Sequence, residues 1–457
     1  MSEAMGQRIR FNAFQMNAAS HQSPGLWTHP RDSAHRYTDP QHWVDLAKLL
    51  ERGVFDGVFL ADVLGVYDVF GGNHEAAVRH GVQVPVNDPL ALVPLMAQAT
   101  EHLGFGVTCA LTYEHPYPFA RRISTLDHLT GGRVGWNIVT GYLDSAARNL
   151  GLSNQLGHDA RYDLADEYMD VVYKLWEKSW ADDAVRRDKA TGTFTDPAKV
   201  RPIRHAGTHY QVPGIHLCEP SPQRTPVLYQ AGTSPRGVAF AARHAECVFI
   251  SGPTETVLKR YVDTVRGGLV AQGRPADDVL IYAQALVITA PTEAEARAKH
   301  RELLEHIDVE ASLALLSGWT GVDFSKYDPD APIEHVDTEA GRTALASFSQ
   351  TDPSRKWAVG EAARFIGLGG RGPVIVGSAS QVADELERWV DATGIDGFNL
   401  TYALAHETMR DVVDHVVPEL QRRGRYATSY SDGTLREKLF ARGPRLGAGH
   451  AATRVRI

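Results

Sequence analysis

Val227-Leu-Tyr-Gln-Ala-Gly-Thr-Ser-Pro-Arg-Gly237 indicates how this chain folds, because it joins a strand pattern directly to a helix start. The residues before Gly232 favour a β-strand, and the pattern stops at that glycine. Ser234 and Pro235 are residue types preferred at the cap and the first position of a helix. Such a helix start can bind a phosphate through its free backbone amides. It is also an ordinary structural junction, so the rest of the chain must decide between the two interpretations.

Strand patterns alternate with helix patterns along the whole chain. The expected strands are residues 8–16, 55–60, 104–112, 133–140, 227–231, 246–250, 279–288 and 397–402. The expected helices are residues 40–52, 89–103, 118–129, 161–178, 255–271, 293–306, 381–392 and 410–422, with another beginning at Ser234. Continuous β-α alternation favours a closed TIM (β/α)8 barrel over an open doubly wound sheet. We therefore expect one α/β barrel domain over residues 1–457, with insertions.

Two segments do not fit the alternation, and a third follows it at the C-terminus. Residues 179–225 and 307–372 are long connections, and the second is rich in Asp, Gly and Pro. Long connections in a compact barrel usually carry function or subunit contacts, and we expect residues 307–372 to form a lid. Residues 424–457 are basic and polar. We expect this C-terminal extension to lie over the barrel surface or against a neighbouring subunit.

The composition is that of a soluble protein that acts on a small molecule. Of the 457 residues, 43% are hydrophobic and 22% are charged, and the net charge of −8 gives no basis for binding nucleic acid or anionic membranes. The chain has no signal-peptide pattern and no long apolar segment, so we expect a cytoplasmic protein. Cys109, Cys218 and Cys247 lack metal-site spacing, and we expect free, buried thiols.

Two motifs imitate known binding sites but lack the surrounding structure. Residues 367–372 match the GxGxxG pattern, but the strand-like residues 374–376 follow where a dinucleotide site needs a helix. We expect a flexible hinge there. His74-Glu75 begins like a zinc protease motif, but the next histidine, His80, would lie on the wrong helical face. We expect no metal site.

Polar and aromatic residues follow the first four expected strands, where a barrel places its active site. These residues are Asn17 and His21 after the first strand, Asp62 after the second, Thr112 and Tyr113 after the third, and Asn137, Thr140 and Tyr142 near the end of the fourth. Only Asp62 is acidic, so neither a carboxylate pair nor a Ser-His-Asp triad is indicated. A bound cofactor that carries out the difficult chemistry fits this set better.

Six motifs together resemble the reduced-flavin monooxygenases of the bacterial luciferase superfamily. They are Asn12-Ala-Phe14, Phe59-Leu-Ala-Asp62, Thr125-Leu-Asp-His-Leu-Thr-Gly-Gly-Arg133, Trp136-Asn-Ile-Val-Thr140, His158-Asp-Ala-Arg-Tyr162 and Gln230-Ala-Gly-Thr-Ser234. The branch that they resemble contains nitrilotriacetate and dibenzothiophene sulfone monooxygenases. Within it, residues 84–89, 219–226 and 394–400 most resemble long-chain alkane and dimethyl sulfide monooxygenases. The similarity runs from about Arg8 to Phe440 with the order of motifs intact.

The resemblance implies a TIM barrel that binds FMN as FMNH2, which a separate NAD(P)H:flavin reductase supplies. Dioxygen would add to the flavin to give a C4a-hydroperoxide. That species would transfer one oxygen atom to an apolar substrate, such as an alkane, an organosulfur compound or a halogenated aromatic. The alternatives are a non-catalytic flavin-binding barrel and a deazaflavin-dependent oxidoreductase. We also expect a homodimer or homotetramer.

The resemblance also implies roles for individual residues. The cofactor-binding residues would be Asp62 and Asn137 at the flavin ring, Gly141 and Tyr142 beside the cofactor, and Tyr162, Gly232, Thr233 and Ser234 at the phosphate. The catalytic residues, which line the space for oxygen and substrate, would be His21, Tyr67 and Gln83.

Some positions depart from the pattern of the alkane enzyme. Where that enzyme has a cysteine this chain has Ala18, and Tyr142 replaces a histidine. Two histidines of its lid correspond to about Ser312 and Leu315. The flavin-facing motifs are therefore kept, whereas the substrate-facing set is altered, which weakens the case for alkane hydroxylation in particular.

Overall fold

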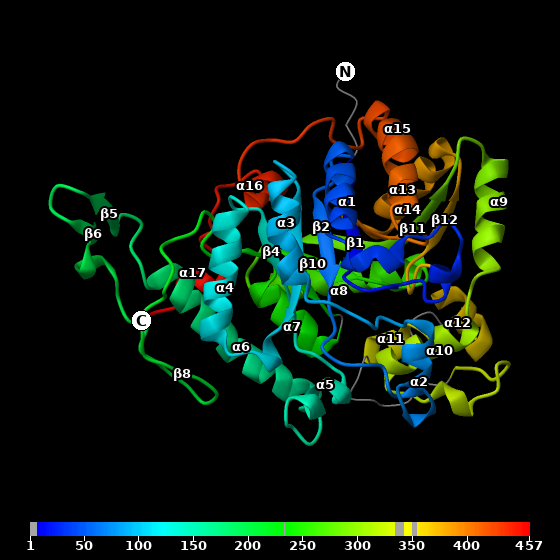
Figure 1. Ribbon diagram of the computed structural model, residues 1–457, viewed down its shortest axis with the longest axis horizontal. Helices are drawn as coiled ribbons and strands as arrows, with labels where there is room; N and C mark the ends of the chain where they lie inside the picture. The colour runs from blue at the N-terminus through cyan, green and yellow to red at the C-terminus, as the bar shows by residue number, and fades with distance from the viewer. Residues whose placement is uncertain (1–6, 233, 334–341, 350–353) are drawn as a thin grey trace.

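Eight parallel strands form a closed barrel (Figure 1). The computed structural model describes residues 7–232, 234–333, 342–349 and 354–457. In spatial order the barrel strands are β1 (Arg10–Met16), β2 (Gly57–Ala61), β3 (Gly104–Ala110), β4 (Val134–Val139), β9 (Val227–Ala231), β10 (Cys247–Ile250), β11 (Leu280–Thr289) and β13 (Gly397–Thr401). β13 returns to β1, with Arg10 opposite Gly397, and β10 pairs with β11, with Cys247 opposite Leu280. The predicted TIM barrel is thus confirmed.

Helices cover the outside of the barrel (Figure 1). They are α1 (Pro40–Arg52), α3 (Leu92–Gln98), α4 (Pro116–Leu129), α6 (His158–Tyr173), α7 (Pro235–His244), α8 (Glu255–Ala271), α9 (Glu293–Leu304), α13 (Ala379–Thr393), α14 (Glu407–Asp411) and α15 (Val417–Arg422). In α1, Asp39 caps the first turn, and Trp43, Leu46 and Leu50 are buried on one face. Each buried apolar side chain of this size stabilises the fold by roughly 1.5–3 kcal/mol.

Residues 89–103 do not form the single helix that their spacing predicts. The helix α3 ends at Gln98. Three successive backbone N–H groups, from Glu101 to Leu103, all donate to Oε1 of Glu51 on α1, at 2.8, 2.6 and 3.0 Å. Because these amides turn toward one carboxylate, they cannot continue the helical hydrogen-bond pattern, and the chain leads directly into β3.

A ninth strand, β12 (Val374–Gly377), pairs with the C-terminal half of β11 outside the ring. The glycine-rich residues 367–372 precede it, so they join a helix to a strand and not a strand to a helix. Gly369 accepts a hydrogen bond from Nε2 of Gln284 at 2.7 Å, and its N–H donates to Oγ of Ser23 at 3.0 Å. This loop is held against the barrel mouth, unlike the flexible hinge that we expected.

Aromatic side chains fill the inside of the barrel. Phe59 lies with its ring centroid 5.6 Å from that of Phe14 and 5.4 Å from that of Tyr229. Phe249 lies 4.8 Å from Phe14 by the same measure. Edge-on contacts of this kind are favourable for aromatic rings. The barrel is therefore a packed core with no central pore.

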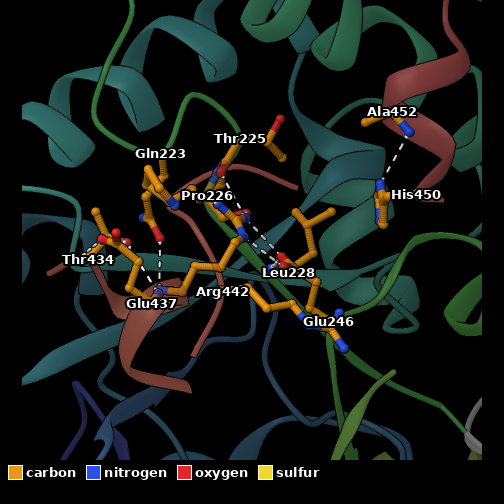
Figure 2. Close-up of polar contacts among 12 residues, drawn as sticks. Gln223, Thr225, Pro226, Leu228, Glu246, Thr434, Glu437, Arg442, His450 and Ala452 are labelled. Carbon is orange, nitrogen blue, oxygen red and sulfur yellow. Dashed lines mark hydrogen bonds and ion pairs between the residues drawn. The ribbon is translucent and has the colours of Figure 1, made fainter. Parts of the chain in front are cut away.

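The C-terminal extension closes the barrel at the N-terminal ends of its strands. Its helix α16 (Leu435–Phe440) begins with a capping box, in which Glu437 N–H donates to Thr434 Oγ1 at 3.3 Å and Thr434 N–H donates to Glu437 Oε2 at 2.8 Å (Figure 2). Leu435 and Leu439 are buried in the same cluster as the interior aromatics. A last helix, α17 (Ala451–Arg454), contacts α7. The extension thus covers the barrel of its own chain.

Arg436 forms a buried ion pair that fixes this extension. Its Nε and Nη2 donate to the two carboxylate oxygens of Glu246 at 2.7 and 2.9 Å, and Nη2 also donates to the carbonyls of Thr225 and Pro226. Figure 2 shows Glu246 beside Leu228, whose N–H donates to the same carboxylate at 3.1 Å. Burial alone would raise the pKa of Glu246, but the guanidinium of Arg436 holds that pKa below its usual value.

The two long connections form small structures around the barrel. Residues 179–225 contain two short hairpins, β5 (Val185–Asp188) with β6 (Thr193–Thr195) and β7 (His205–Ala206) with β8 (Gln211–Val212). Residues 307–372 contain α10 (Val309–Thr320), α11 (Arg342–Ser349) and α12 (Val359–Ile366), which lie beside α2 (Glu75–His80) in Figure 1. Leu315, Phe348 and Trp357 belong to an apolar core that these helices share with α5 (Asp144–Asn149).

The cysteines are free, as expected, but only one of the three is buried. All three thiols are free; Cys247 is buried, whereas Cys109 and Cys218 are partly exposed. None of the helices in the described ranges combines the length and the apolar character needed to cross a membrane.

Replacing Arg436 with Met tests the contribution of the buried ion pair. The variant leaves the Glu246 carboxylate buried without its counter-charge, so we expect the free energy of unfolding to fall by roughly 3–5 kcal/mol. Urea unfolding followed by circular dichroism measures the change. In the matched double variant Arg436→Met/Glu246→Gln we expect most of the loss to be recovered. An equal loss in both variants would contradict this account.

Candidate active site

Two cavities adjoin each other at the C-terminal ends of the barrel strands. The first has a volume of about 260 Å³ and is lined by the ends of β4 and β9 and the starts of α6 and α7. The second has a volume of about 300 Å³ and lies over the mouth of the barrel. Residues that line both are Asp62, Val63, Val139, Tyr142, Ala231 and Gly232. The two cavities therefore share one wall and form a single site with two chambers.

The first cavity includes the start of α7. Ser234 caps this helix, since its Oγ accepts from the N–H of Gly237 at 3.1 Å. The same Oγ lies 3.2 Å from Nε2 of His158. Tyr162 on α6 lines the cavity beside Ser234, and burial raises the pKa of its hydroxyl. Thr233, the remaining predicted phosphate ligand, lies outside the described residues.

Two glycines bring the backbone close to the first cavity, which both of them line. A Cβ at Gly232 would lie 2.7 Å from Nε2 of Gln230. A Cβ at Gly141 would lie 2.5 Å from Oη of Tyr113, and the φ of Gly141 is 64°. Residues with side chains rarely adopt that conformation. Gly141 therefore needs glycine, whereas at Gly232 a side chain would have to displace the amide of Gln230, and a ligand can approach the backbone at both positions.

His158 and Arg161 also line the first cavity, although they were not among the predicted site residues. Both lie in the first turn of α6, where positions 158, 161 and 162 share one face. Nη1 of Arg161 donates to the carbonyl of Leu156 at 2.6 Å. Its positive charge and the start of α7 both favour an anion in this cavity. The spacing within the motif at residues 158–162 was the signal that could have identified them.

The second cavity brings together the three predicted catalytic residues. Oη of Tyr67 donates to Oε1 of Gln83 at 2.9 Å, and Nε2 of Gln83 donates to the carbonyl of His21 at 3.0 Å. Oη of Tyr142 lies 2.9 Å from Oη of Tyr67. All four side chains line the cavity. A continuous hydrogen-bond chain therefore runs along its wall.

The imidazole of His21 is neutral. Burial lowers its pKa to about 3, and the backbone of Phe14 opposes this effect only in part. Nε2 of His21 lies 3.0 Å from Nε2 of Gln22, whose Oε1 accepts from Nε2 of Gln284 at 3.2 Å. Because that contact fixes the orientation of the Gln22 amide, Nε2 of His21 is the acceptor and its proton lies on Nδ1.

Asn137 and Asp62 present unusual polar groups to the second cavity. Nδ2 of Asn137 donates to Oγ1 of Thr108 at 2.8 Å, but its Oδ1 is buried and has no hydrogen-bond partner within the described part of the chain. A buried acceptor of this kind costs roughly 1–3 kcal/mol unless a ligand donates to it. Burial and the nearby charge of Asp88 raise the pKa of Asp62 to about 7, against the effect of the Val63 amide.

Three residues from the segment 307–372 complete the wall of the second cavity. They are Trp319 on α10, Ala344 on α11 and Arg371 in the glycine-rich loop. The guanidinium of Arg371 lies 5.3 Å from the centroid of the Trp319 ring. No local pattern predicted these positions, because the segment reaches the barrel mouth through the packing of its helix α10 against α12 and against α2 outside the segment.

The arrangement suits a phosphate-bearing aromatic ligand. One chamber offers a helix start, a guanidinium and two glycines, and the other offers the unpartnered acceptor of Asn137 above the aromatic floor. These residues fit FMN, with its phosphate in the first cavity. Within the ranges that the structure describes, no group of three or more His, Cys, Asp or Glu residues could hold a metal ion.

Asp62 predicts a pH-dependent stability. Its pKa is about 7 in the folded protein against a reference value of 3.8, so the folded state holds the proton more tightly. The stability that this carboxyl contributes is then fully present below about pH 4 and is lost as the pH rises toward about 7. We expect the thermal midpoint of the flavin-free protein, relative to Asp62→Asn, to fall across that window. A difference that does not vary with pH would rule this out.

Sequence and structure comparisons agree with this geometry. The family described as luciferase-like monooxygenase matches residues 16–397. A dimethyl-sulfide monooxygenase of Hyphomicrobium sulfonivorans is 51% identical over 453 residues, which cover 99% of this chain and 94% of the relative. A long-chain alkane monooxygenase of Geobacillus thermodenitrificans is 48% identical over 453 residues, which cover 99% of each chain.

A solved structure gives the same result. Riboflavin lyase (RcaE), with modified FMN and its substrate riboflavin, is similar with a TM-score of 0.92 at 36% identity, over 99% of this chain and 100% of that chain. The closed barrel, its two-chambered site and these similarities together show that the chain belongs to the luciferase-like monooxygenase family, whose members use reduced flavin.

Proposed function

We propose that this chain is the oxygenase component of a two-component FMN system. It receives FMNH2 from a separate NAD(P)H:flavin reductase and inserts one atom of dioxygen into an apolar organic substrate. The reaction balances as RH + O2 + FMNH2 giving ROH + H2O + FMN, and a sulfide gives a sulfoxide in the same way. The observation that carries the proposal is an anion-binding cavity that shares a wall with a second cavity lined mainly by apolar and neutral groups.

The cofactor contacts follow from the two chambers. Ser234, Arg161 and the start of α7 hold the phosphate, and Gly232 lets it approach the backbone. In the second chamber, Oδ1 of Asn137 accepts a hydrogen bond from an N–H of the flavin ring, which satisfies its buried lone pairs. When bound, reduced FMN supplies the two electrons that activate dioxygen. The modified FMN in the riboflavin lyase structure supports this choice of cofactor.

The hydrogen-bond chain fixes which groups face the substrate. The amide N–H of Gln83 donates to the carbonyl of His21, so the amide oxygen of Gln83 is free to accept from the hydroxyl of Tyr67. Because the Tyr67 hydroxyl donates its proton to Gln83, it accepts from the hydroxyl of Tyr142. Tyr142 is then left with free lone pairs that can accept from a ligand hydroxyl or a water. Burial raises the pKa of Tyr142 to about 12, so the phenol stays protonated. The hydroxyl and amide hydrogens of this wall therefore have fixed directions, and the tyrosine and glutamine side chains that hold them are uncharged.

Exclusion of water follows from the apolar residues of the second cavity. Phe14, Phe59 and Phe249 form its floor, and Trp319 lies on the wall made by α10. A dry chamber strengthens the remaining hydrogen bonds and limits wasteful release of peroxide. We propose that residues 307–372 act as the lid of this chamber, because Trp319, Ala344 and Arg371 all come from that segment.

The substrate class follows from the relatives and from the departures in this chain. The two relatives are named for dimethyl sulfide and for long-chain alkanes. Tyr142 lies in the wall of the chamber where the alkane enzyme would place a histidine, and its hydroxyl is tied to Tyr67. We therefore expect organosulfur compounds to be better substrates than long-chain alkanes.

Incubation with FMN, NADH, a flavin reductase and isotopically labelled dioxygen tests the function. We expect one labelled atom in the product of a dialkyl sulfide, with faster turnover than for hexadecane. Tight binding of FMN without oxidation of any sulfide, alkane or halogenated aromatic would support the non-catalytic barrel instead. Turnover that requires a deazaflavin and ignores FMN would support the third alternative.

The substitution Ser234→Asp tests the phosphate site. Aspartate still caps the helix but adds a negative charge where the phosphate binds, so we expect the affinity for FMN to fall roughly tenfold or more. The affinity for riboflavin, which lacks the phosphate, changes far less. Fluorescence titration measures both. Ser234→Ala is the matched control, since it removes the hydroxyl without adding charge and should give an intermediate loss. Unchanged FMN affinity in Ser234→Asp would disprove the assignment.

A further inference from the structure

Arg371 is a cation in the second cavity that forms no ion pair with any of the residues that the structure describes. Its partly buried side chain lines the cavity and makes no hydrogen bond or ion pair with any residue that the structure describes. Its one recorded contact is with the ring of Trp319. Burial lowers the pKa of Arg371, and the groups that oppose this effect are the phenols of Tyr261, Tyr142 and Tyr67.

Two arginines that are buried more deeply than Arg371 make many polar contacts. Arg133 donates to four backbone carbonyls and to Oγ1 of Thr100. Arg436 binds both carboxylate oxygens of Glu246. A partly buried guanidinium without such partners is costly, because its charge loses hydration and gains nothing in return. The missing partner of Arg371 is therefore expected to be a ligand.

The position of Arg371 indicates which ligand this is. It lines the second cavity but not the first, and it belongs to the lid segment and not to the wall that the two cavities share. The residues that fit the cofactor, such as Ser234 and Asn137, come from the barrel strands and the start of α7. The cation thus lies on the substrate side of the chamber.

Apart from Arg371 and the carboxyl of Asp62, whose pKa is about 7, the chamber is lined by apolar side chains and by polar groups that carry no charge. Phe14, Phe59, Phe249 and Ile250 line it, and His21 beside them is neutral. A substrate that fits must therefore carry an apolar body together with one group that satisfies a guanidinium. Carboxylates and sulfonates do this best, because two of their oxygens match the planar fork of an arginine.

We propose that the natural substrate is an amphipathic organic anion, with a carboxylate or sulfonate that pairs with Arg371 and an apolar body that extends toward the flavin. The inference rests on the proposed monooxygenase function and narrows its substrate class. It also gives the lid a role, since the segment that covers the chamber carries the group that recognises the substrate.

A pair of matched substrates tests the proposal. We compare (hexylthio)acetate with the neutral (hexylthio)acetamide, which has nearly the same shape, in the reductase-coupled assay with FMN. We expect kcat/KM to favour the carboxylate roughly ten- to a hundredfold, the range of a charge-assisted hydrogen bond. In Arg371→Gln this ratio should fall to about one. The control Arg364→Gln removes an exposed arginine of α12 and should keep the wild-type ratio.

Binding measurements separate this proposal from the proposed function. Calorimetry with the FMN-loaded protein should show binding of (hexylthio)acetate that weakens tenfold or more in Arg371→Gln, whether or not the compound is oxidised. If neither these compounds nor the sulfides, alkanes and halogenated aromatics of the first assay are oxidised, the proposed function fails, and the calorimetry alone decides the present inference. A preference for the amide would overturn it. Loss of FMN affinity in Arg371→Gln would also overturn it, because the charge would then serve the flavin.

Discussion

The pairing of β10 with β11 closes the sheet, and the arrangement of the site depends on that closure. Cys247 to Ile250 pair with Leu280 to Ala283, so each of the eight barrel strands has a neighbour on both sides. A closed parallel ring brings all the C-terminal strand ends around one opening. Side chains as distant along the chain as His21 and Arg371 therefore line one cavity. The aromatic packing inside the ring keeps a ligand at this mouth, because it leaves no room further in.

Much of this architecture could be predicted from the sequence, because it depends on local periodicity. The strands can be predicted from the alternation of apolar and polar residues and from the turn residues between them. Asp62 and Asn137 can then be placed at the site, because the C-terminal ends of barrel strands meet at one face. Arg371 could not be found in this way. Its place in the site is set by the packing of α10 to α12 and by a glycine loop that contacts Gln284. The helix end at Gln98 was missed for a similar reason, since Glu51 on another helix determines it.

Charge is distributed unevenly between the two chambers. The first combines the guanidinium of Arg161 with the positive ends of two helices, an arrangement that favours a phosphate. In the second, burial keeps His21 neutral and holds the carboxyl of Asp62 near its titration point at neutral pH. Apart from the guanidinium of Arg371, this chamber therefore carries little fixed charge, which limits the water that its side chains attract.

The proposed phosphate site follows the fifth barrel strand, which needs a physical reason because barrel phosphate sites are commonly built after strands seven and eight. In this chain α6, which follows the fourth strand, brings Arg161 and Tyr162 to the start of α7. The connection after the seventh strand, β11, includes the segment 307–372, which supplies Trp319 and Arg371 to the other chamber. Residues 307–372 therefore occupy the position where many barrels bind phosphate. Arg161 and Arg371 lie in separate chambers, so under the two proposals above the anionic ends of the cofactor and the substrate would lie apart, with their neutral ends toward the shared wall.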